Sequence, residues 1–595
     1  MSRPVAREHG PDVDHVWGNL RVFLPAGPIG RACQLGDDGL VPQLTELADE
    51  VHVFADLTDV SSAVKGSDPS VGGGFDLVVV DEVERVGQGM FDPISDARVL
   101  CRSGGTVVLG TSSRLERVLL GRRTGPSGRW WLATLPGPRR PAFAFDPGDD
   151  LAAEHFMRSL AFAYRPPGRR GLRGRIIQAR NRLALLAPPW AALGAAPGRV
   201  AILSEGGSSP SLLEEVEAFV RGSWRDLDLP GRAPDRFSPL VVAHRKTALA
   251  VVSVLLLGGE SPIVAKLPRY GASSSAVRRE SANLDTVYPA LTGAIRRTVP
   301  RPLGLHEIGG VEVHLQTGLP GRLLAAESAR RLRPSRLRRQ LELMFTWSRR
   351  LQRSSGRWAV LDDELIRTRL EPLAAAAVAA LDGDRAVREL LDRTLDHARE
   401  LHGTPIRLGV AHGDLWAGNV LVEDEAITGV VDWERAAGDE LPIWDPVKAV
   451  LDAAYHLDRY RSLPRRGPGA VPRWGRLGPW KGIADPTRAR GFRAALVEPS
   501  WLSELAADAL IDAFVGAEIP VGWLPVAIPF HLVREFVHPD ASERSVQAWG
   551  SVLRALAAHP GTWADRLVGD RRGARSRPSP DVEIAGERAS AGGAA

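Results

Sequence analysis

Three oxygen-bearing side chains stand at the edges of apolar segments in residues 410–436, VAHGDLWAGNVLVEDEAITGVVDWERA. Asp414 and Asn419 lie five residues apart around a Trp-Ala-Gly turn, and Asp432 follows Gly-Val-Val. The runs NVLV and ITGVVDW, separated by EDEA, predict an antiparallel hairpin that turns near residues 424–425. In such a hairpin the start of the first strand lies beside the end of the second, so Asn419 and Asp432 would meet at its open end.

Oxygen ligands at the mouth of a hairpin suit a hard cation. Mg²⁺ binds carboxylate and amide oxygens and takes its other ligands from water and substrate phosphates, so we expect Asn419 and Asp432 to bind it. Asp414 would hang over the same mouth, where a carboxylate can accept the proton of an attacking hydroxyl or orient that hydroxyl. Each of these residues alone is ordinary turn or strand-end chemistry. The three together, directly after His412, favour a reaction site.

The order His-Gly-Asp-x-x-x-x-Asn, a hairpin and then Val-Asp-Trp-Glu resembles the aminoglycoside phosphotransferase and choline kinase-like family, whose members are relatives of protein kinases. Protein kinases likewise use a catalytic-loop Asp and Asn together with a later metal-binding Asp. The resemblance implies that Asp414 is the catalytic residue, that Asn419 and Asp432 bind the metal, and that His412 braces the catalytic loop. It also implies that ATP is the phosphate donor.

Two further acids fall within the same pattern. Asp432 is followed by Trp-Glu, where protein kinases have Phe-Gly. Glu434 is therefore open to two interpretations, either a helper at the metal or a surface residue. Asp445, in PIWDPVKAV, matches a later Asp of the family that usually holds the fold together.

A lobe that holds ATP should precede these residues. SPIVAKLP places Lys266 at the end of a strand-like run, where its ammonium can reach phosphates while the alkyl stem stays buried. Glu280, in a segment with helical spacing, would pair with Lys266. The alternative for Lys266 is a lysine that aids solubility on an edge strand, and the alternative for Glu280 is an acid on a solvated helix face. VEVHLQTGLPGRLL resembles the kinase hinge, which implies that the backbone around Leu315 to Thr317 contacts adenine.

The expected phosphate loop departs from the protein-kinase pattern. VVAHRKTALA, residues 241–250, contains no glycine, and the chain has no Walker motif. The side chains of His244, Arg245 or Lys246 could take over the contact with phosphates.

The front of the chain predicts a different fold. Residues 20–165 alternate short apolar runs with segments of helical spacing, which is typical of a Rossmann-like parallel sheet with crossover helices. Residues 75–111 resemble class I S-adenosylmethionine methyltransferases, and Asp56 stands where that fold binds a ribose. The first glycine loop, FLPAGPIG, lacks the usual acid and carries Pro25 and Pro28, so we expect a damaged cofactor site.

Composition excludes several classes of protein. Hydrophobic residues make up 44% and charged residues 25% of the 595 residues, which is typical of globular protein. The net charge of +5 is small and the arginines are mixed with acids, so we expect no nucleic-acid partner. The longest apolar run, residues 248–259, is too short to span a bilayer. With only Cys33 and Cys101, and no apolar secretory signal in residues 1–19, a reducing cytoplasm is the expected location.

The sequence thus predicts a multidomain α/β plus α+β protein, in which a Rossmann-like domain precedes a bilobal protein kinase-like fold. The expected parts are a methyltransferase-like domain (1–165), a linker region (166–236), a kinase-like N-lobe (237–316), a helical C-lobe (317–570) and a disordered tail (571–595). The expected function is transfer of phosphate from ATP, with Mg²⁺, to a hydroxyl of a small polar metabolite. A methyltransferase whose kinase-like half only binds substrate and a non-catalytic pseudokinase scaffold are the alternatives.

Overall fold

The fold comes from a computed structural model, in which two compact units make up the described part of the chain. The first unit takes in the described residues up to Arg278 together with Leu303–Gly318. The second takes in Arg279–Pro302 and the described residues from Leu319 onward. The described residues are 29–35, 44–45, 48–54, 75–80, 101–111, 130–134, 142–145, 199–204, 210–243, 251–258, 262–268, 274–325, 334–459, 492, 495–496, 501–538, 541 and 543–558.

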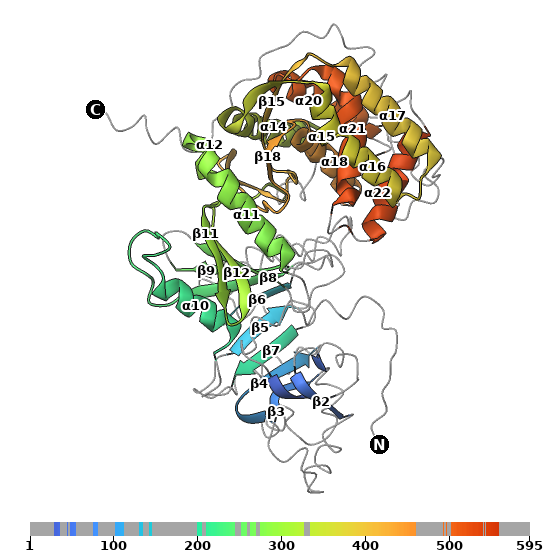
Figure 1. The fold of residues 1–595 in the computed structure, drawn as a ribbon. Helices are drawn as coiled ribbons and strands as arrows, with labels where there is room; N and C mark the ends of the chain where they lie inside the picture. Colours follow the sequence, from blue (N-terminus) through green and yellow to red (C-terminus); the bar gives the residue numbers. More distant parts are fainter. Residues whose placement is uncertain are drawn as a thin grey trace, which may run out of the picture. The chain divides into compact units, whose positions relative to one another are not determined.

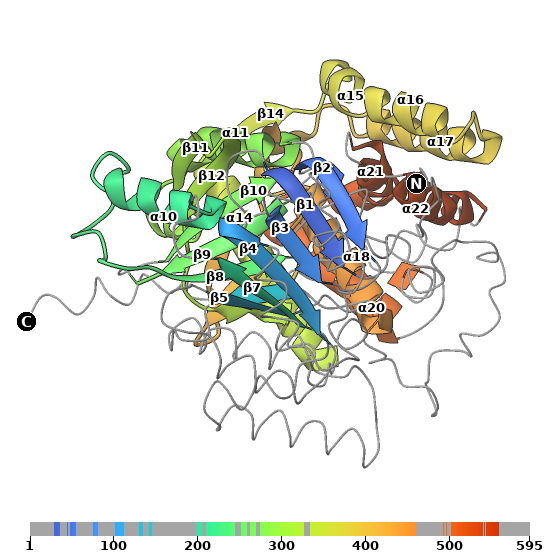
Figure 2. The ribbon, with the colours of Figure 1, turned by 90° about the horizontal axis from the view of Figure 1, so that it is seen from below.

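The first unit is built on one twelve-stranded sheet with the order β11-β12-β10-β9-β8-β6-β5-β7-β4-β3-β1-β2 (Figure 1 and Figure 2). Its strands are β1 (Ile29–Leu35), β2 (Ala48–Phe54), β3 (Phe75–Val80), β4 (Cys101–Thr111), β5 (Trp130–Thr134), β6 (Ala142–Phe145), β7 (Arg199–Ser204), β8 (Ser238–Ala243), β9 (Val251–Leu257), β10 (Ile263–Pro268), β11 (Pro302–Ile308) and β12 (Val311–Thr317).

The strands β2, β1, β3 and β4 pair in parallel, and β4 then pairs antiparallel with β7. These four strands lie within residues 20–165, where a parallel sheet was expected. The segments between the strands, where crossover helices and Asp56 were expected, lie outside the described residues apart from residues 44–45. A complete Rossmann-like domain and its likeness to methyltransferases therefore stay predictions.

The position of β1 corrects one expectation. Gly30 was expected in a loop after the first strand, but it lies inside β1. The backbone N–H of its neighbour Arg31 donates to Asp76 Oδ2 on β3 at 2.9 Å. A Cβ on Gly30 would lie 3.1 Å from that same oxygen, so this glycine serves close packing between two strands.

The predicted linker region, 166–236, contains regular structure. It holds β7 and α10 (Leu212–Gly222). Ser211 caps α10 in a capping box with Glu214, and the buried apolar residues of the helix recur at helical spacing. These two elements are regular secondary structure within a region expected to be a linker.

The second unit is mostly helical. Its helices are α11 (Ser275–Ala290, whose first turn belongs to the first unit), α12 (Gly293–Arg297), α14 (Pro334–Ser355), α15 (Asp363–Arg369), α16 (Glu371–Ala380), α17 (Arg385–Glu400), α18 (Trp444–Arg459), α20 (Trp501–Gly516), the short η5 (Val521–Trp523), α21 (Leu524–Val537) and α22 (Glu543–Ala557). Two three-stranded sheets accompany them, formed by β13 (Arg322–Leu323), β16 (Val420–Glu423) and β17 (Ala426–Val430), and by β14 (Arg357–Val360), β15 (Pro405–Ala411) and β18 (Ala437–Glu440).

The core of the second unit is apolar and closely packed around buried tryptophans. Trp347 and Trp433 are almost fully buried, with ring centroids 6.1 Å apart, and His412 packs edge-on against Trp433 at 4.7 Å. This core fixes the backbone on both sides of the predicted site. None of the helices in the described ranges is long and apolar enough to cross a membrane.

Candidate active site

The loop that carries Asp414 begins where β15 ends. Asp445, at the start of α18, accepts hydrogen bonds from the backbone N–H groups of His412 at 2.9 Å and Gly413 at 2.8 Å. Burial raises the pKa of Asp445, and these two backbone hydrogen bonds oppose that rise. The prediction that Asp445 holds the fold together is confirmed for this loop.

Gly413 meets two conformational demands at once. Its φ is +77°, a region that L side chains rarely adopt, and a Cβ there would lie 2.2 Å from the carbonyl oxygen of Arg435. Glycine alone allows the loop to turn against the segment that follows the hairpin.

His412 braces the loop from inside. Its buried ring accepts a hydrogen bond at Nδ1 from the backbone N–H of Asp414, at 3.3 Å, and Nε2 lies 3.0 Å from the carbonyl oxygen of Val431. A neutral ring protonated on Nε2 satisfies both contacts. The histidine thereby ties the loop that carries Asp414 to Val431, directly after β17.

The predicted hairpin is confirmed. β16 and β17 pair antiparallel and are joined by Asp424 and Glu425, both at positive φ (45° and 66°). At the open end Val431 N–H donates to Asn419 O at 2.9 Å, which places Asn419 beside the residue that precedes Asp432. Asp432 itself has φ +73°. Unusual backbone of this kind in a non-glycine residue is concentrated at functional sites.

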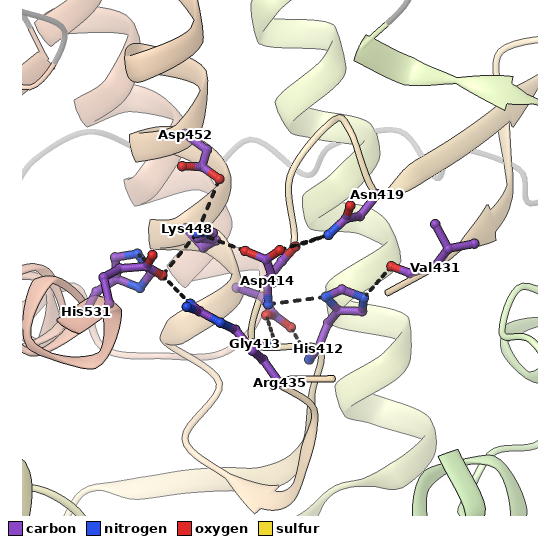
Figure 3. Close-up of polar contacts among 11 residues, drawn as sticks. His412, Gly413, Asp414, Asn419, Val431, Arg435, Lys448, Asp452 and His531 are labelled. Atoms are coloured by element: carbon purple, nitrogen blue, oxygen red, sulfur yellow. Dashed lines mark hydrogen bonds and ion pairs between the residues drawn. The ribbon is translucent and has the colours of Figure 1, made fainter. Parts of the chain in front are cut away.

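Asp414 and Asn419 are in direct contact. Asn419 Nδ2 donates to Asp414 Oδ2 and to Asp414 O, both at 3.0 Å (Figure 3). Because both bonds use the amide nitrogen, Asn419 Oδ1 is the atom that can face a cation. The structure thus brings together the catalytic and metal-binding candidates on this side of the site.

A buried lysine that the sequence analysis assigned no role completes the cluster. Lys448 Nζ on α18 lies 2.9 Å from Asp414 Oδ1, 3.3 Å from Asp452 Oδ2 and 3.0 Å from Glu535 Oε1 of α21 (Figure 3). Arg435 Nη1 binds the same Glu535 oxygen at 3.0 Å. Asp414 therefore has an ammonium beside Oδ1 and an amide hydrogen-bond donor at Oδ2.

The charges of the cluster stabilise one another. Burial alone would lower the pKa of Lys448, but the three carboxylates outweigh it and raise the pKa above its ordinary value. Burial alone would raise the pKa of Glu535, but Lys448 and Arg435 outweigh it and lower the pKa. Burial lowers the pKa of His531, 3.8 Å from Glu535, to about 3, so that histidine is neutral near pH 7.

The segment after Asp432 is fixed to α11. Trp433 N–H donates to Glu280 Oε1 at 3.4 Å, and Asn283 Nδ2 donates to the carbonyl oxygens of Trp433 at 3.0 Å and Glu434 at 3.1 Å. Glu280, expected from the sequence to pair with Lys266, thus has a partner in the backbone next to Asp432. Its pairing with Lys266 stays a prediction.

The predicted nucleotide-contacting residues lie in the first unit. Lys266 is buried on β10, and Leu315 and Thr317 lie on the neighbouring strand β12, where they pair with Ala265 and Ile263. Their predicted roles in binding phosphate and adenine stay predictions. The glycine-free loop lies outside the described residues from His244 onward.

The donor set suits a hard cation with few protein ligands. Within the described ranges, no group of three or more His, Cys, Asp or Glu side chains is arranged to hold a metal. Asn419 and Asp432 offer an amide oxygen and a carboxylate as candidate ligands, and a Mg²⁺ held by such a pair would take its other ligands from water and nucleotide phosphates. Amide and carboxylate oxygens of this kind fit Mg²⁺.

Lys448, Glu535, Arg435 and Asn283 were not anticipated as parts of the site. Lys448 had the one usable signal, because a lysine in the apolar segment PVKAVL is unusual in a chain with five lysines. Glu535, Arg435 and Asn283 have partners far away in sequence, so no local pattern predicts their place in the site.

One protein-family model matches the part of the chain that carries the candidate site. The model of the phosphotransferase enzyme family matches residues 250–462, which include Lys266, Asp414, Asn419 and Asp432. No curated protein matches the chain in sequence.

Several solved structures are similar to part of the chain. A glucosamine kinase is 20% identical and aligns over 58% of this chain and 85% of its own, with a TM-score of 0.30. A putative fructosamine-3-kinase from Thermobifida fusca is 16% identical over 56% of this chain and 97% of its own, with a TM-score of 0.29. A macrolide 2'-phosphotransferase from Brachybacterium faecium is 16% identical over 58% and 98%, with a TM-score of 0.31.

Proposed function

We propose that the protein transfers the γ-phosphate of ATP, with Mg²⁺, to a hydroxyl group of a small polar metabolite such as a sugar, amino sugar or amino alcohol. The observation that carries the proposal is the oriented carboxylate of Asp414, bound by Asn419 at the mouth of the hairpin that ends at Asp432. The match of residues 250–462 to the phosphotransferase enzyme family supports it.

Phosphoryl transfer asks a protein mainly to position groups and neutralise charge. Asp414 orients the acceptor hydroxyl and accepts its proton as the oxygen attacks phosphorus. Asn419 and Asp432 would hold Mg²⁺, which would supply positive charge to neutralise the phosphates. Lys266 contacts the nucleotide phosphates, and backbone groups around Leu315 to Thr317 contact adenine. Glu280 fixes the segment after Asp432 and pairs with Lys266, which orients the lysine toward the nucleotide.

A screen of acceptors tests the proposal directly. The full chain is incubated with Mg²⁺ and ATP, and ADP release is followed across a panel of sugars, amino sugars and amino alcohols. We expect ADP release that depends on one acceptor class and yields a phosphomonoester of it. ATP binding without transfer to any acceptor on the panel would contradict the proposal and indicate a non-catalytic kinase-like scaffold.

A further inference from the structure

We infer that Lys448 is a positioning residue for phosphoryl transfer, whose ammonium fixes the Asp414 carboxylate in the orientation that meets the acceptor hydroxyl. The inference rests on the proposed function, because Asp414 is the group through which Lys448 acts. It adds a residue on α18 to a site otherwise built from the catalytic loop and the hairpin.

The contacts of Lys448 leave its ammonium little freedom. An ammonium has three N–H donors. Three carboxylate oxygens, from Asp414, Asp452 and Glu535, lie within 3.3 Å of Nζ. Asp452 is four residues along the same helix and Glu535 lies on α21, so two fixed helices hold the lysine from behind. The third carboxylate oxygen beside the ammonium is Asp414 Oδ1, at 2.9 Å.

Glu535 already has another cation, because Arg435 binds the same Glu535 oxygen at 3.0 Å. Neutralising Glu535 therefore does not by itself explain the presence of Lys448. Burying a lysine costs free energy that a structural role could avoid with an apolar side chain. Its placement next to Asp414, the most exposed of its three carboxylates, is what distinguishes it (Figure 3).

Lys448 and Asn419 together orient the carboxylate of Asp414 and still leave it able to accept another proton. Lys448 binds Oδ1 at 2.9 Å and Asn419 binds Oδ2 at 3.0 Å, which prevents rotation of the carboxylate. Each carboxylate oxygen has two lone pairs, so one oxygen still accepts the proton of the acceptor hydroxyl. A misplacement of about 1 Å in such a group can cost on the order of 100-fold in rate.

The test replaces Lys448 and at the same time neutralises Glu535, so that no buried charge of Glu535 is left with one cation fewer. Lys448→Met keeps an unbranched side chain, one atom shorter and without charge. Glu535→Gln, made in the same protein, removes the carboxylate that would otherwise lose one of its two cations. We expect this double variant to bind Mg²⁺-ATP as the wild type does and to transfer phosphate with kcat reduced by about 10- to 100-fold.

The same double variant is then made in an Asp414→Asn protein. If Lys448 acts through Asp414, it lowers the residual kcat there by no more than about twofold, because the carboxylate it positions is already gone. An equal loss in both backgrounds would mean a structural role, and no loss beside an intact Asp414 would equally overturn the inference. Asp452→Asn, a milder change behind the lysine, is expected to show the same dependence on Asp414, and it replaces the double variant if that protein does not fold.

Two controls separate the possible failures. Arg385→Met removes an exposed ion pair with Glu389 on α17 and is expected to leave kcat unchanged. The wild-type protein is measured first, with the acceptor found in the screen. Absence of transfer by the wild type would overturn the proposed function and this inference with it, whereas transfer that is insensitive to Lys448 overturns the inference alone.

Discussion

Single residues decide whether the catalytic loop can form, and Gly413 is the strictest case. The loop must turn at positive φ and at the same time approach Arg435 O so closely that no Cβ fits. The close approach arises because the chain after the hairpin passes next to the loop and places Arg435 against Gly413. Neither demand is visible in the sequence beyond the presence of a glycine before an aspartate.

Gly413→Ala is therefore expected to lower the free energy of unfolding by about 2–4 kcal/mol, the sum of a left-handed backbone and a steric overlap. Gly403→Ala is the matched control, since Gly403 has φ +83° and nothing lies within 4 Å of its Cβ position. That variant should lose only about 1–2 kcal/mol. Chemical denaturation measures both, and equal losses would contradict the claim of close approach.

Glu535 predicts a pH dependence of stability. Lys448 and Arg435 hold its pKa in the folded chain below the ordinary value of 4.5. As pH falls below about 4.5 the unfolded chain takes up a proton that the folded chain does not, so stability is lost, by up to about 1.4 kcal/mol per pH unit. Glu535→Gln should flatten this slope below pH 4.5 and leave the slope near neutral pH unaltered. Identical acid slopes in the two proteins would contradict the burial and pairing of Glu535.

At the scale of elements, the hairpin β16–β17 could be predicted because its signals are local. Alternating apolar residues and a short acidic turn are neighbours in sequence. Its turn residues, Asp424 and Glu425, both have positive φ, a conformation for which Asn-Gly is the favoured pair. The hairpin is therefore built with a turn that is not the most stable one for its geometry.

Glu425→Gly is expected to raise the free energy of unfolding by about 0.5–1 kcal/mol, because glycine adopts φ +66° without strain. Glu425 also forms an exposed ion pair with Arg339. Glu425→Ala loses that pair yet keeps the Cβ, so it serves as the control and should not be stabilised. Thermal unfolding of the two variants compares them, and a destabilised glycine variant would argue against the turn geometry.

The elements that could not be predicted depend on distant partners. Lys448 meets Glu535, 87 residues away, only because α18 and α21 pack in the same core. Similarly, Gly30 looked like part of a loop because the strand that it joins is defined by pairing with β2 and β3. Local patterns thus located Asp414, Asn419 and Asp432, while the residues that hold them required the tertiary structure.

At the scale of the whole molecule, the strands do not separate at residue 165. Strands β5 and β6 pair with β7 and β8, which come later in the chain, so the front of the protein shares one sheet with β9, β10 and β12. Lys266, Leu315 and Thr317 lie on that sheet. We propose that the front part serves as a packing or docking module for the kinase-like part.

The full chain is accordingly expected not to bind S-adenosylmethionine. Gly30 belongs to a strand, and Pro25 and Pro28 each remove a backbone donor from the segment where a glycine turn would approach the cofactor. Calorimetry on the full chain is the appropriate measurement, because a fragment ending at 165 would lose β7 and β8. Micromolar binding would contradict this expectation and identify a bifunctional enzyme.

The central claim is that Asp414 is the catalytic carboxylate of a phosphotransferase. Asp414→Asn keeps the shape of the side chain and removes the carboxylate that accepts the proton. With the acceptor identified by the screen, the decisive measurement is kcat for phosphate transfer in this variant beside its affinity for Mg²⁺-ATP. We predict a fall in kcat of roughly two to four orders of magnitude with nucleotide affinity retained. Near-normal turnover in a folded, nucleotide-binding Asp414→Asn protein would contradict the account.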